Sequence, residues 1–406
     1  MLRLFTKTFA MQTPSDQTLK MGNRIQSIDF LRGLVMVIMA LDHVRDFFHW
    51  AAFHFDPLDL SQTSIPIFLT RWITHFCAPV FVFLAGTSAY LTGVRKGKKA
   101  LSKFLITRGI WLLIVEVVII NFAFSFDIHF GTIALQTIWA LGISMIFLSF
   151  LIYLPKKLLL LLALLIIFCH NLLDNIHMPG NGLQALGWSM LHEPKFFPYH
   201  PTNIFVLYPV LAWIGVMAAG YCFGELYTKF ELEKRKKILI VLGLSCIMLF
   251  IVIRFTNIYG DASHWAIQKT PTFTVLSFIN TTKYPPSLLY ILMTIGPAIF
   301  LLAFIEKRLN RFGNIILTFG KVPMFYYILH FYMIHVSSVI AGVLTGHNFY
   351  EMLLQGPTRE PLQNYGFKLW IVYSVWLSIV ALLYPLCKRY AKYKLNHPAK
   401  WWLSYL

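Results

Sequence analysis

Ten apolar stretches divide the sequence, and each is long enough to cross a lipid bilayer as a helix of about 20 residues. They cover approximately residues 28–48, 68–93, 103–124, 131–154, 157–176, 203–223, 237–254, 286–305, 322–344 and 367–387. Only 13% of the residues are charged, whereas a soluble domain carries about a quarter charged residues. A water-soluble enzyme of this length is therefore excluded. We predict an all-α, polytopic membrane protein with about ten transmembrane helices.

The basic residues gather in alternate connections between these stretches. Of the 35 Lys and Arg residues, 26 lie in the two tails and in the even-numbered connections. Because cytoplasmic connections carry the excess of Lys and Arg, this pattern predicts that both termini are cytoplasmic. The formal net charge of +18 thus reflects membrane topology and does not indicate a nucleic-acid partner. We expect a multi-pass protein of the inner or plasma membrane, in contact with the lipid bilayer.

The sequence divides into one membrane domain and two tails. We expect a cytoplasmic N-terminal tail over residues 1–24, a transmembrane domain over 25–390 and a basic cytoplasmic C-terminal tail over 391–406. The five cysteines lie in apolar stretches without the spacing of metal ligands, so we expect packed thiols, no disulfide framework and no metal site. This organisation is compatible with a homo-oligomer.

A polar stripe follows one face of the first apolar stretch. Asp42, Arg45, Asp46 and His49 recur at intervals of three and four residues, and His43 lies beside them. Counted from Ile28 at about 1.5 Å per residue, Asp42 lies roughly 21 Å into a core of about 30 Å. Ionisable groups at such a depth are usually functional. The structural alternative is that Asp42 is only a counter-charge to Arg45.

Three further titratable groups reach a similar depth. Glu116 lies on the third stretch and His335 on the ninth, while His75 enters the second stretch from the outside. Pro79 clashes with the carbonyl group four residues earlier, so we predict a kink that frees the carbonyl of His75. The freed carbonyl group and the imidazole of His75 are candidates for lining a binding site. Alternatively, His75 only bonds a neighbouring helix.

The loop after the first stretch holds two more histidines, His49 and His54. Imidazole changes charge near neutral pH, so either group could act as a general base or nucleophile. They could equally be interfacial residues among Trp50 and Phe55. A zinc site built from these histidines is disfavoured, because neither HxxxH nor HExxH is present.

Four segments of the sequence resemble a known family. They are RIQSIDFLRGLVMVIMALDHVRDFF (24–48), THFCAPVFVFLAGTSAYL (74–91), TTKYPPSLLYILMTIGP (281–297) and FGKVPMFYYILHFYMIH (319–335). They are similar to the transmembrane acyltransferases grouped with the heparan-alpha-glucosaminide N-acetyltransferase catalytic domain. The likeness covers about residues 25–390, and the chain resembles the bacterial-type members of the family in size. Its most specific element is the opening RxxSxDxxRG pattern.

The resemblance implies an activity and a set of site residues. Members take acetyl from acetyl-CoA on the cytoplasmic side and deliver it to a glycan amine or hydroxyl group on the other side. The family histidine just outside the first helix matches His54 best, with His49 as its competitor, and His43 and His75 join Asp42 as further candidates. The lysosomal enzyme carries Asn at the position of Asp42 and has a lumenal N-terminal domain not found here. The resemblance therefore leaves the acceptor open.

Three basic residues are candidates for holding the phosphates of acetyl-CoA. Arg24, Arg32 and Lys321 lie at the cytoplasmic ends of the two helices that most resemble the family, and cations attract phosphate groups. Arg32 is the strongest candidate, because it lies slightly inside the apolar run. The alternative is that Arg32 only pairs with Asp29 three residues earlier.

These observations favour a membrane-bound acyltransferase that acetylates an extracytoplasmic carbohydrate or another polar acceptor. Two chemical routes stay open. In one, His54 attacks the thioester and forms an acetyl-imidazole; in the other, a histidine or Asp42 deprotonates an acceptor bound together with acetyl-CoA. We favour the direct route, with His54 as the base and Asp42 or Asp46 orienting an imidazole. The alternative function is a proton-coupled transporter that uses Asp42, Glu116 and His335 as a relay.

Overall fold

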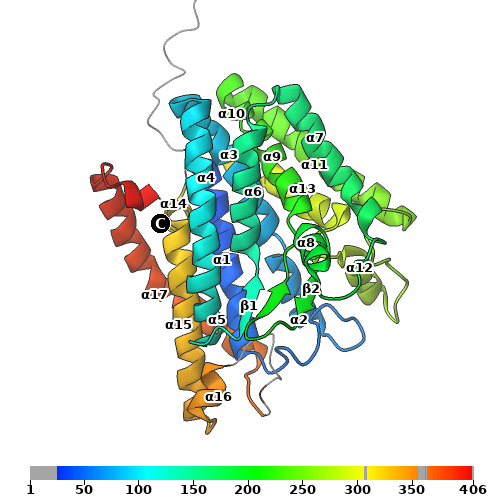
Figure 1. Ribbon diagram of the computed structural model, residues 1–406, viewed down its shortest axis with the longest axis vertical. Helices are drawn as coiled ribbons and strands as arrows, with labels where there is room; N and C mark the ends of the chain where they lie inside the picture. The colour runs from blue at the N-terminus through cyan, green and yellow to red at the C-terminus, as the bar shows by residue number, and fades with distance from the viewer. Residues whose placement is uncertain (1–24, 306–308, 355–361, 363, 405–406) are drawn as a thin grey trace, which may run out of the picture.

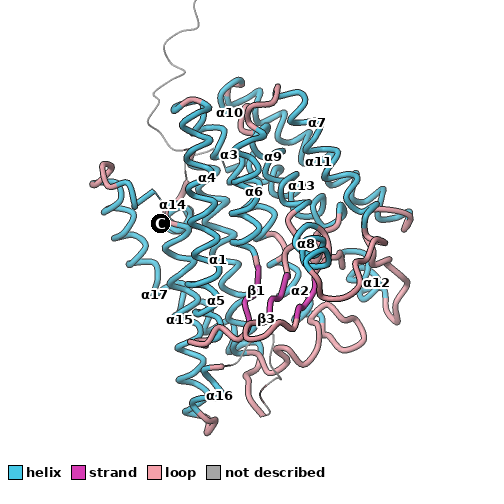
Figure 2. The backbone as a smooth tube through the Cα atoms, in the orientation of Figure 1, coloured by secondary structure: helices cyan, strands magenta, loops and turns pink. Residues whose placement is uncertain are grey.

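The computed structural model describes residues 25–305, 309–354, 362 and 364–404 of the chain, and helices dominate this part (Figures 1 and 2). The long helices are α1 (Gln26–Phe48), α3 (Cys77–Lys96), α4 (Lys98–Ile114), α6 (Thr137–Leu151), α7 (Lys156–Cys169), α9 (Leu211–Phe223), α11 (Leu232–Thr256), α13 (Leu288–Ile305), α14 (Arg311–Lys321), α15 (Pro323–Leu344) and α17 (Leu369–Asn396). Shorter elements are α2 (Ile65–Thr74), η1 (Val115–Ile120), α5 (Asn121–Ser125), η2 (His170–Leu173), α8 (Leu183–Leu191), α10 (Leu226–Lys229), α12 (Pro271–Ile279), α16 (Phe349–Leu353) and η3 (Trp401–Ser404).

Seven helical segments of the described chain are long and apolar enough to cross a membrane. They are Ile65–Lys96, Lys98–Ser125, Lys156–Leu173, Leu232–Thr256, Leu288–Ile305, Pro323–Leu344 and Leu369–Asn396. Helices also occupy the three other predicted stretches, but α1 carries several charges and α6 and α9 span only 15 and 13 residues. The all-α polytopic class is confirmed, while the count of ten spans and the cytoplasmic termini stay predictions.

Two of the predicted helices begin later than expected. We expected helix from residue 131 and from residue 203, and this is wrong at both places because strands β1 (Thr132–Leu135) and β3 (Asn203–Val206) lie there. With β2 (Lys195–Phe197) they form a small sheet in the order β1-β3-β2, in which β1 and β3 are parallel and β2 and β3 antiparallel. Short runs of β-branched and aromatic residues suit strands as well as helices.

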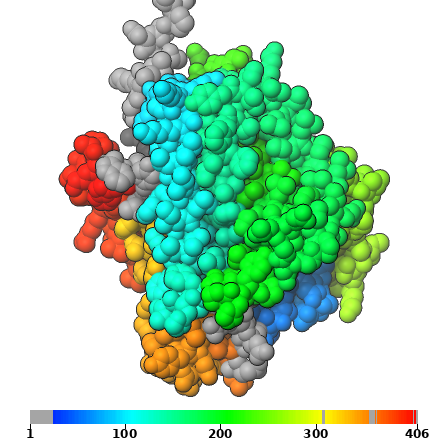
Figure 3. Space-filling model, in the orientation of Figure 1, coloured from blue at the N-terminus to red at the C-terminus, as the bar shows by residue number. Residues whose placement is uncertain are grey.

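Helix α1 lies at the centre of the bundle and packs against α14 with backbone in contact. A Cβ atom at Gly33 would overlap the carbonyl oxygen of Ile316, and one at Gly320 would overlap the carbonyl oxygen of Asp29. Small residues at such crossings let two helices approach closely inside a membrane. In the orientation of Figure 1, the surfaces of α4 and α6 cover α1, which is hidden in Figure 3.

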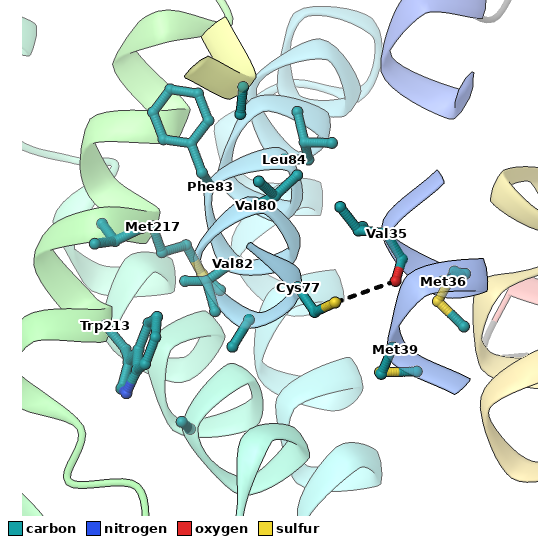
Figure 4. Close-up of a cluster of buried hydrophobic side chains, with 14 of the residues drawn as sticks. Val35, Met36, Met39, Cys77, Val80, Val82, Phe83, Leu84, Trp213 and Met217 are labelled. Atoms are coloured by element: carbon teal, nitrogen blue, oxygen red, sulfur yellow. Dashed lines mark hydrogen bonds between the residues drawn. The ribbon is translucent and has the colours of Figure 1, made fainter. Parts of the chain in front are cut away.

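On its other side α1 packs against α3, which in turn packs against α9. Figure 4 shows Val35 of α1 opposite Cys77 of α3, where the Cys77 thiol donates to the carbonyl oxygen of Val35 at 3.3 Å. Phe83 and its neighbours fill the space toward Met217. The thiol of Cys77 is thus packed, as expected, whereas the expectation is wrong for Cys169, which is exposed at the end of α7.

The break between α2 and α3 lies where Pro79 predicts it. Helix α2 ends at Thr74 and α3 begins at Cys77. The carbonyl oxygen of His75 accepts a hydrogen bond from the Tyr290 hydroxyl at 2.8 Å. The predicted break is confirmed, and α13 uses the carbonyl group that it frees. The imidazole of His75 therefore lies at a junction between α2, α3 and α13.

Candidate active site

Asp42 lies between two arginines in the interior of the bundle. Its Oδ2 is 2.5 Å from Nη1 of Arg71 on α2, and its Oδ1 is 3.1 Å from Nη2 of Arg45. The same nitrogen of Arg45 lies 2.5 Å from Oδ1 of Asp46. The pairing of Asp42 with Arg45, which was the structural alternative to a functional role, is therefore present. Arg71 is a partner that the sequence analysis did not identify, because it lies on a different helix.

A loop between α12 and α13 brings Lys283 and Tyr284 to this cluster. Nη2 of Arg71 donates to the Tyr284 hydroxyl at 3.5 Å, and Nζ of Lys283 lies 5.1 Å from the centre of the Tyr284 ring. Lys283 is buried. Asp261 holds this loop, since it accepts hydrogen bonds from Thr282 and Ser287. Neither Lys283 nor Tyr284 was predicted as a site residue, because a polar loop gives no sign in the sequence of folding inward.

Three imidazoles near this cluster have buried ring nitrogens without a hydrogen-bond partner among the described residues. Neither nitrogen of His75 has a partner, nor does Nδ1 of His43 or Nε2 of His330. His330 donates through Nδ1 to the carbonyl oxygen of Tyr326 at 3.1 Å, so its Nε2 carries the free lone pair. The rings of His43 and His330 lie 5.2 Å apart. Buried polar atoms are normally satisfied, so these nitrogens are placed to meet water or a ligand.

The two histidines after α1 lie in different surroundings. His49 is buried, and its Nδ1 accepts from the Ala51 amide at 3.2 Å. Burial, together with the Arg45 charge, lowers the pKa of His49 to about 4. His54 is exposed on the following turn. No contact between described residues joins the His54 side chain to Asp42, so the structure brings Asp42, His43 and His75 into the interior and leaves His54 on the surface.

Glu116 and His335 bind separate backbone groups. Oε2 of Glu116, in the π-helical turn η1, accepts from the Trp139 amide at 2.9 Å. Nδ1 of His335 donates to the carbonyl oxygen of Ala123 at 2.8 Å, and its ring stacks on Phe126 at 4.1 Å. Both side chains are fully buried. The hydrogen bonds and ion pairs of the described residues do not link Asp42, Glu116 and His335 into one chain.

A cavity of about 470 Å³ is lined mainly by α1, α3, α4, α6 and α15, with further residues from α10, α14 and α17. At the end where α1 begins, its lining is basic and includes Arg32, Arg95, Arg108, Lys321 and Lys394. Nη1 of Arg32 donates to Oδ1 of Asp29 at 2.8 Å, which is the pairing considered as the alternative to phosphate binding. Nη2 of Arg32 donates to the Ser88 hydroxyl at 2.7 Å. Two of the three predicted phosphate contacts, Arg32 and Lys321, therefore line one cavity, while Arg24 lies outside the described residues.

The inner end of this cavity is apolar and lies next to the buried histidines. Met39, Ile138 and Tyr327 line it. Met39 precedes His43 by one helical turn, and Tyr327 precedes His330 by three residues. Measured along α1 from Ile25 to Met39 at about 1.5 Å per residue, the cavity is roughly 21 Å deep. It thus leads from the basic end of the bundle toward the cluster around Asp42.

The comparison with known protein families identifies the chain. The family model described as "Heparan-alpha-glucosaminide N-acetyltransferase, catalytic" matches residues 24–254. The chain belongs to this family. By family, the chain is therefore a membrane acetyltransferase. The matched residues include α1, the parts of α3, α4 and α6 that line the cavity, and His54. A comparison with curated proteins finds no match.

Proposed function

We propose that the chain transfers an acetyl group from cytoplasmic acetyl-CoA to a carbohydrate or another small polar acceptor on the opposite side of the inner or plasma membrane. One observation carries this proposal: a single cavity with a basic mouth and an apolar body ends one helical turn from His43 and Asp42. Such a cavity suits a donor whose phosphates are anionic and whose acyl-bearing arm is slender and largely uncharged.

The basic residues at the mouth would hold the donor's phosphates. Arg32, Arg95 and Arg108 come from three different helices, and Lys321 comes from a fourth. Guanidinium groups bind phosphate oxygens in pairs, and the lysine adds a point charge. The thioester would then lie near Met39 and Tyr327, below the imidazoles of His43 and His330. The acceptor would approach from the opposite end, where His54 lies.

Two chemical routes remain within this proposal. In one route an imidazole removes the acceptor's proton while the acceptor attacks the thioester carbon, the C–S bond breaks and CoA leaves as the thiol after taking that proton. In the other, the imidazole attacks the thioester and releases CoA, and the acceptor then takes the acetyl group from the acetyl-imidazole and regenerates the histidine. His54 matches the family position, whereas His43 and His75 lie beside Asp42. Because two arginines hold both oxygens of Asp42, we assign it an electrostatic role toward an imidazole and not that of the base.

Transfer of label from radiolabelled acetyl-CoA tests the proposal with the purified full chain. Replacing the histidine that acts as base or nucleophile by alanine lowers the rate at least ~100-fold. The variants are His54→Ala, His49→Ala, His43→Ala and His75→Ala. The control is His129→Ala, which removes an exposed loop histidine. Undiminished transfer in all four variants would overturn the assignment.

A thermal-shift measurement separates this function from proton-coupled transport. A ligand that binds only the folded protein raises its apparent stability with concentration. We expect acetyl-CoA to raise the melting temperature of the detergent-solubilised chain. Absence of a shift, together with uptake driven by a pH gradient in proteoliposomes, would favour the transporter.

A further inference from the structure

A second cavity, of about 1100 Å³, lies beside the first at the basic end of the bundle. Its walls come from the first residues of α1 and α11, from α14 and from the last turns of α17. Lys321 and Lys394 line both cavities. The second cavity is thus separate from the inner end of the first and shares two cations with its mouth.

The lining of this second cavity is strongly cationic. Five basic residues from three helices converge on it: Arg235, Lys321, Lys388, Lys392 and Lys394. Asp29 is the one acidic residue among the described lining residues, and it is already paired with Arg32. Basic residues are common on the cytoplasmic side of membrane proteins, where they usually lie dispersed on loops. Their convergence on a cavity indicates an anionic ligand.

The helices that flank this cavity face lipid. The apolar windows of α11 and α17 are only 22% and 17% buried within the chain. Leu232 and Leu395 line the cavity and are exposed, so an apolar rim borders the basic lining. A ligand with a phosphate group and acyl chains satisfies both surfaces at once, whereas free phosphate satisfies only the basic one.

We propose that this cavity binds the headgroup of an anionic phospholipid from the cytoplasmic leaflet. The phosphate lies among Arg235, Lys388 and Lys392, and the acyl chains run along α11 and α17. Because Lys321 and Lys394 also line the donor cavity, a bound headgroup competes for the charges that attract the donor's phosphates. Anionic lipid therefore lowers the affinity for acetyl-CoA. Only this last consequence rests on the proposed function.

Nanodiscs of phosphatidylcholine with increasing phosphatidylglycerol test the lipid site on the full chain. Phosphatidylglycerol raises the melting temperature, and native mass spectrometry shows it retained. Lys388→Gln/Lys392→Gln removes two exposed cations that line only the second cavity. Each basic residue near an anionic lipid surface contributes about a fivefold change in binding, so we expect this variant to bind phosphatidylglycerol at least about tenfold more weakly.

Two controls make the result decisive. Arg95→Gln/Arg108→Gln removes charges that line only the first cavity, and it leaves phosphatidylglycerol binding unchanged. Phosphatidylglycerol raises the Kd for acetyl-CoA in the unsubstituted chain more than in Lys388→Gln/Lys392→Gln, although the membrane surface potential is the same. Unchanged lipid binding in Lys388→Gln/Lys392→Gln would overturn the proposal. Equal stabilisation by inorganic phosphate in detergent would overturn it too, because that result assigns the cavity to free phosphate.

Discussion

Arg71 of α2 binds Asp42 of α1 through a contact of 2.5 Å between Nη1 and Oδ2. The contact joins two helices that are separated in sequence by the loop of residues 49–64, and both side chains are largely shielded from solvent. A carboxylate in such surroundings is stable only when it is paired and hydrogen-bonded. The pair therefore fixes where α2 meets α1 and offsets the charge of Asp42 beside His43 and His75.

Removing Arg71 leaves a buried carboxylate with one partner fewer. We expect Arg71→Gln to lower the free energy of unfolding by about 3–5 kcal/mol, the range for breaking a buried ion pair by removing one partner. Asp42→Asn tests the same contact from the other side. The measurement is thermal stability of the two single variants and the double variant. Additive losses would show that the two side chains do not interact energetically.

Gly33 provides a second test of how α1 is held. A Cβ atom there would overlap the carbonyl oxygen of Ile316, so we expect Gly33→Ala to lower stability by about 1–3 kcal/mol through overpacking. The matched control is Gly187→Ala in α8, where a Cβ atom meets nothing within 4 Å. The control should keep or raise the melting temperature, because alanine favours a helix over glycine. Equal losses in both variants would contradict the close packing of α1 and α14.

Several parts of this arrangement could be predicted because they depend on residues close in sequence. The i,i+3 pair of Asp42 and Arg45 follows from helical spacing, and the break before α3 follows from Pro79. The sequence pattern of strands β1 and β3 could not be distinguished from that of the first turns of the helices that follow them. Their backbone groups are paired with each other across more than sixty positions of sequence, and local pattern carries no information on such a pairing.

The missed site residues share one physical reason. Arg71, Lys283 and Tyr284 reach Asp42 only because the chain folds α2 and the α12–α13 loop against α1. A lysine in a polar loop is usually solvated, and only the tertiary contacts show that Lys283 is buried. Residues from several helices far apart in the sequence line the cavity, so its basic end could be predicted only as a general surplus of charge at one end of the bundle.

The arginines at the cavity mouth should control donor affinity. We expect Arg95→Gln/Arg108→Gln to raise the KM for acetyl-CoA about tenfold, equivalent to about 1.4 kcal/mol, with kcat unchanged. The effect should shrink at high salt, which screens exposed charges. Lys98→Gln/Lys99→Gln removes the same charge from the neighbouring exposed turn outside the cavity lining. A similar KM in both variants would mean that surface charge, and not the cavity, attracts the donor.

His49 should make the fold sensitive to acid. Burial lowers the pKa of His49 to about 4, helped by the Arg45 charge, whereas an unfolded histidine titrates near 6.5. The unfolded state therefore takes up the proton first, and stability falls as the pH drops from about 6.5 toward 4. At pH 5 the loss is about 2 kcal/mol. Melting temperatures at pH 7.5 and pH 5 should differ less in His49→Gln than in the unsubstituted chain, and an equal difference would contradict this.

Filling the apolar body of the first cavity should stop donor entry without disturbing the residues around Asp42. Ala85 of α3 lines the cavity, so Ala85→Trp places an indole where the acyl-bearing arm of acetyl-CoA would lie. We expect acetyl transfer to fall at least about 100-fold, since the reacting groups no longer meet. The control is Ile110→Trp on the exposed face of α4, outside the cavity lining. Thermal stability confirms that both variants fold, and full acetyl transfer by Ala85→Trp would show that the donor takes another path.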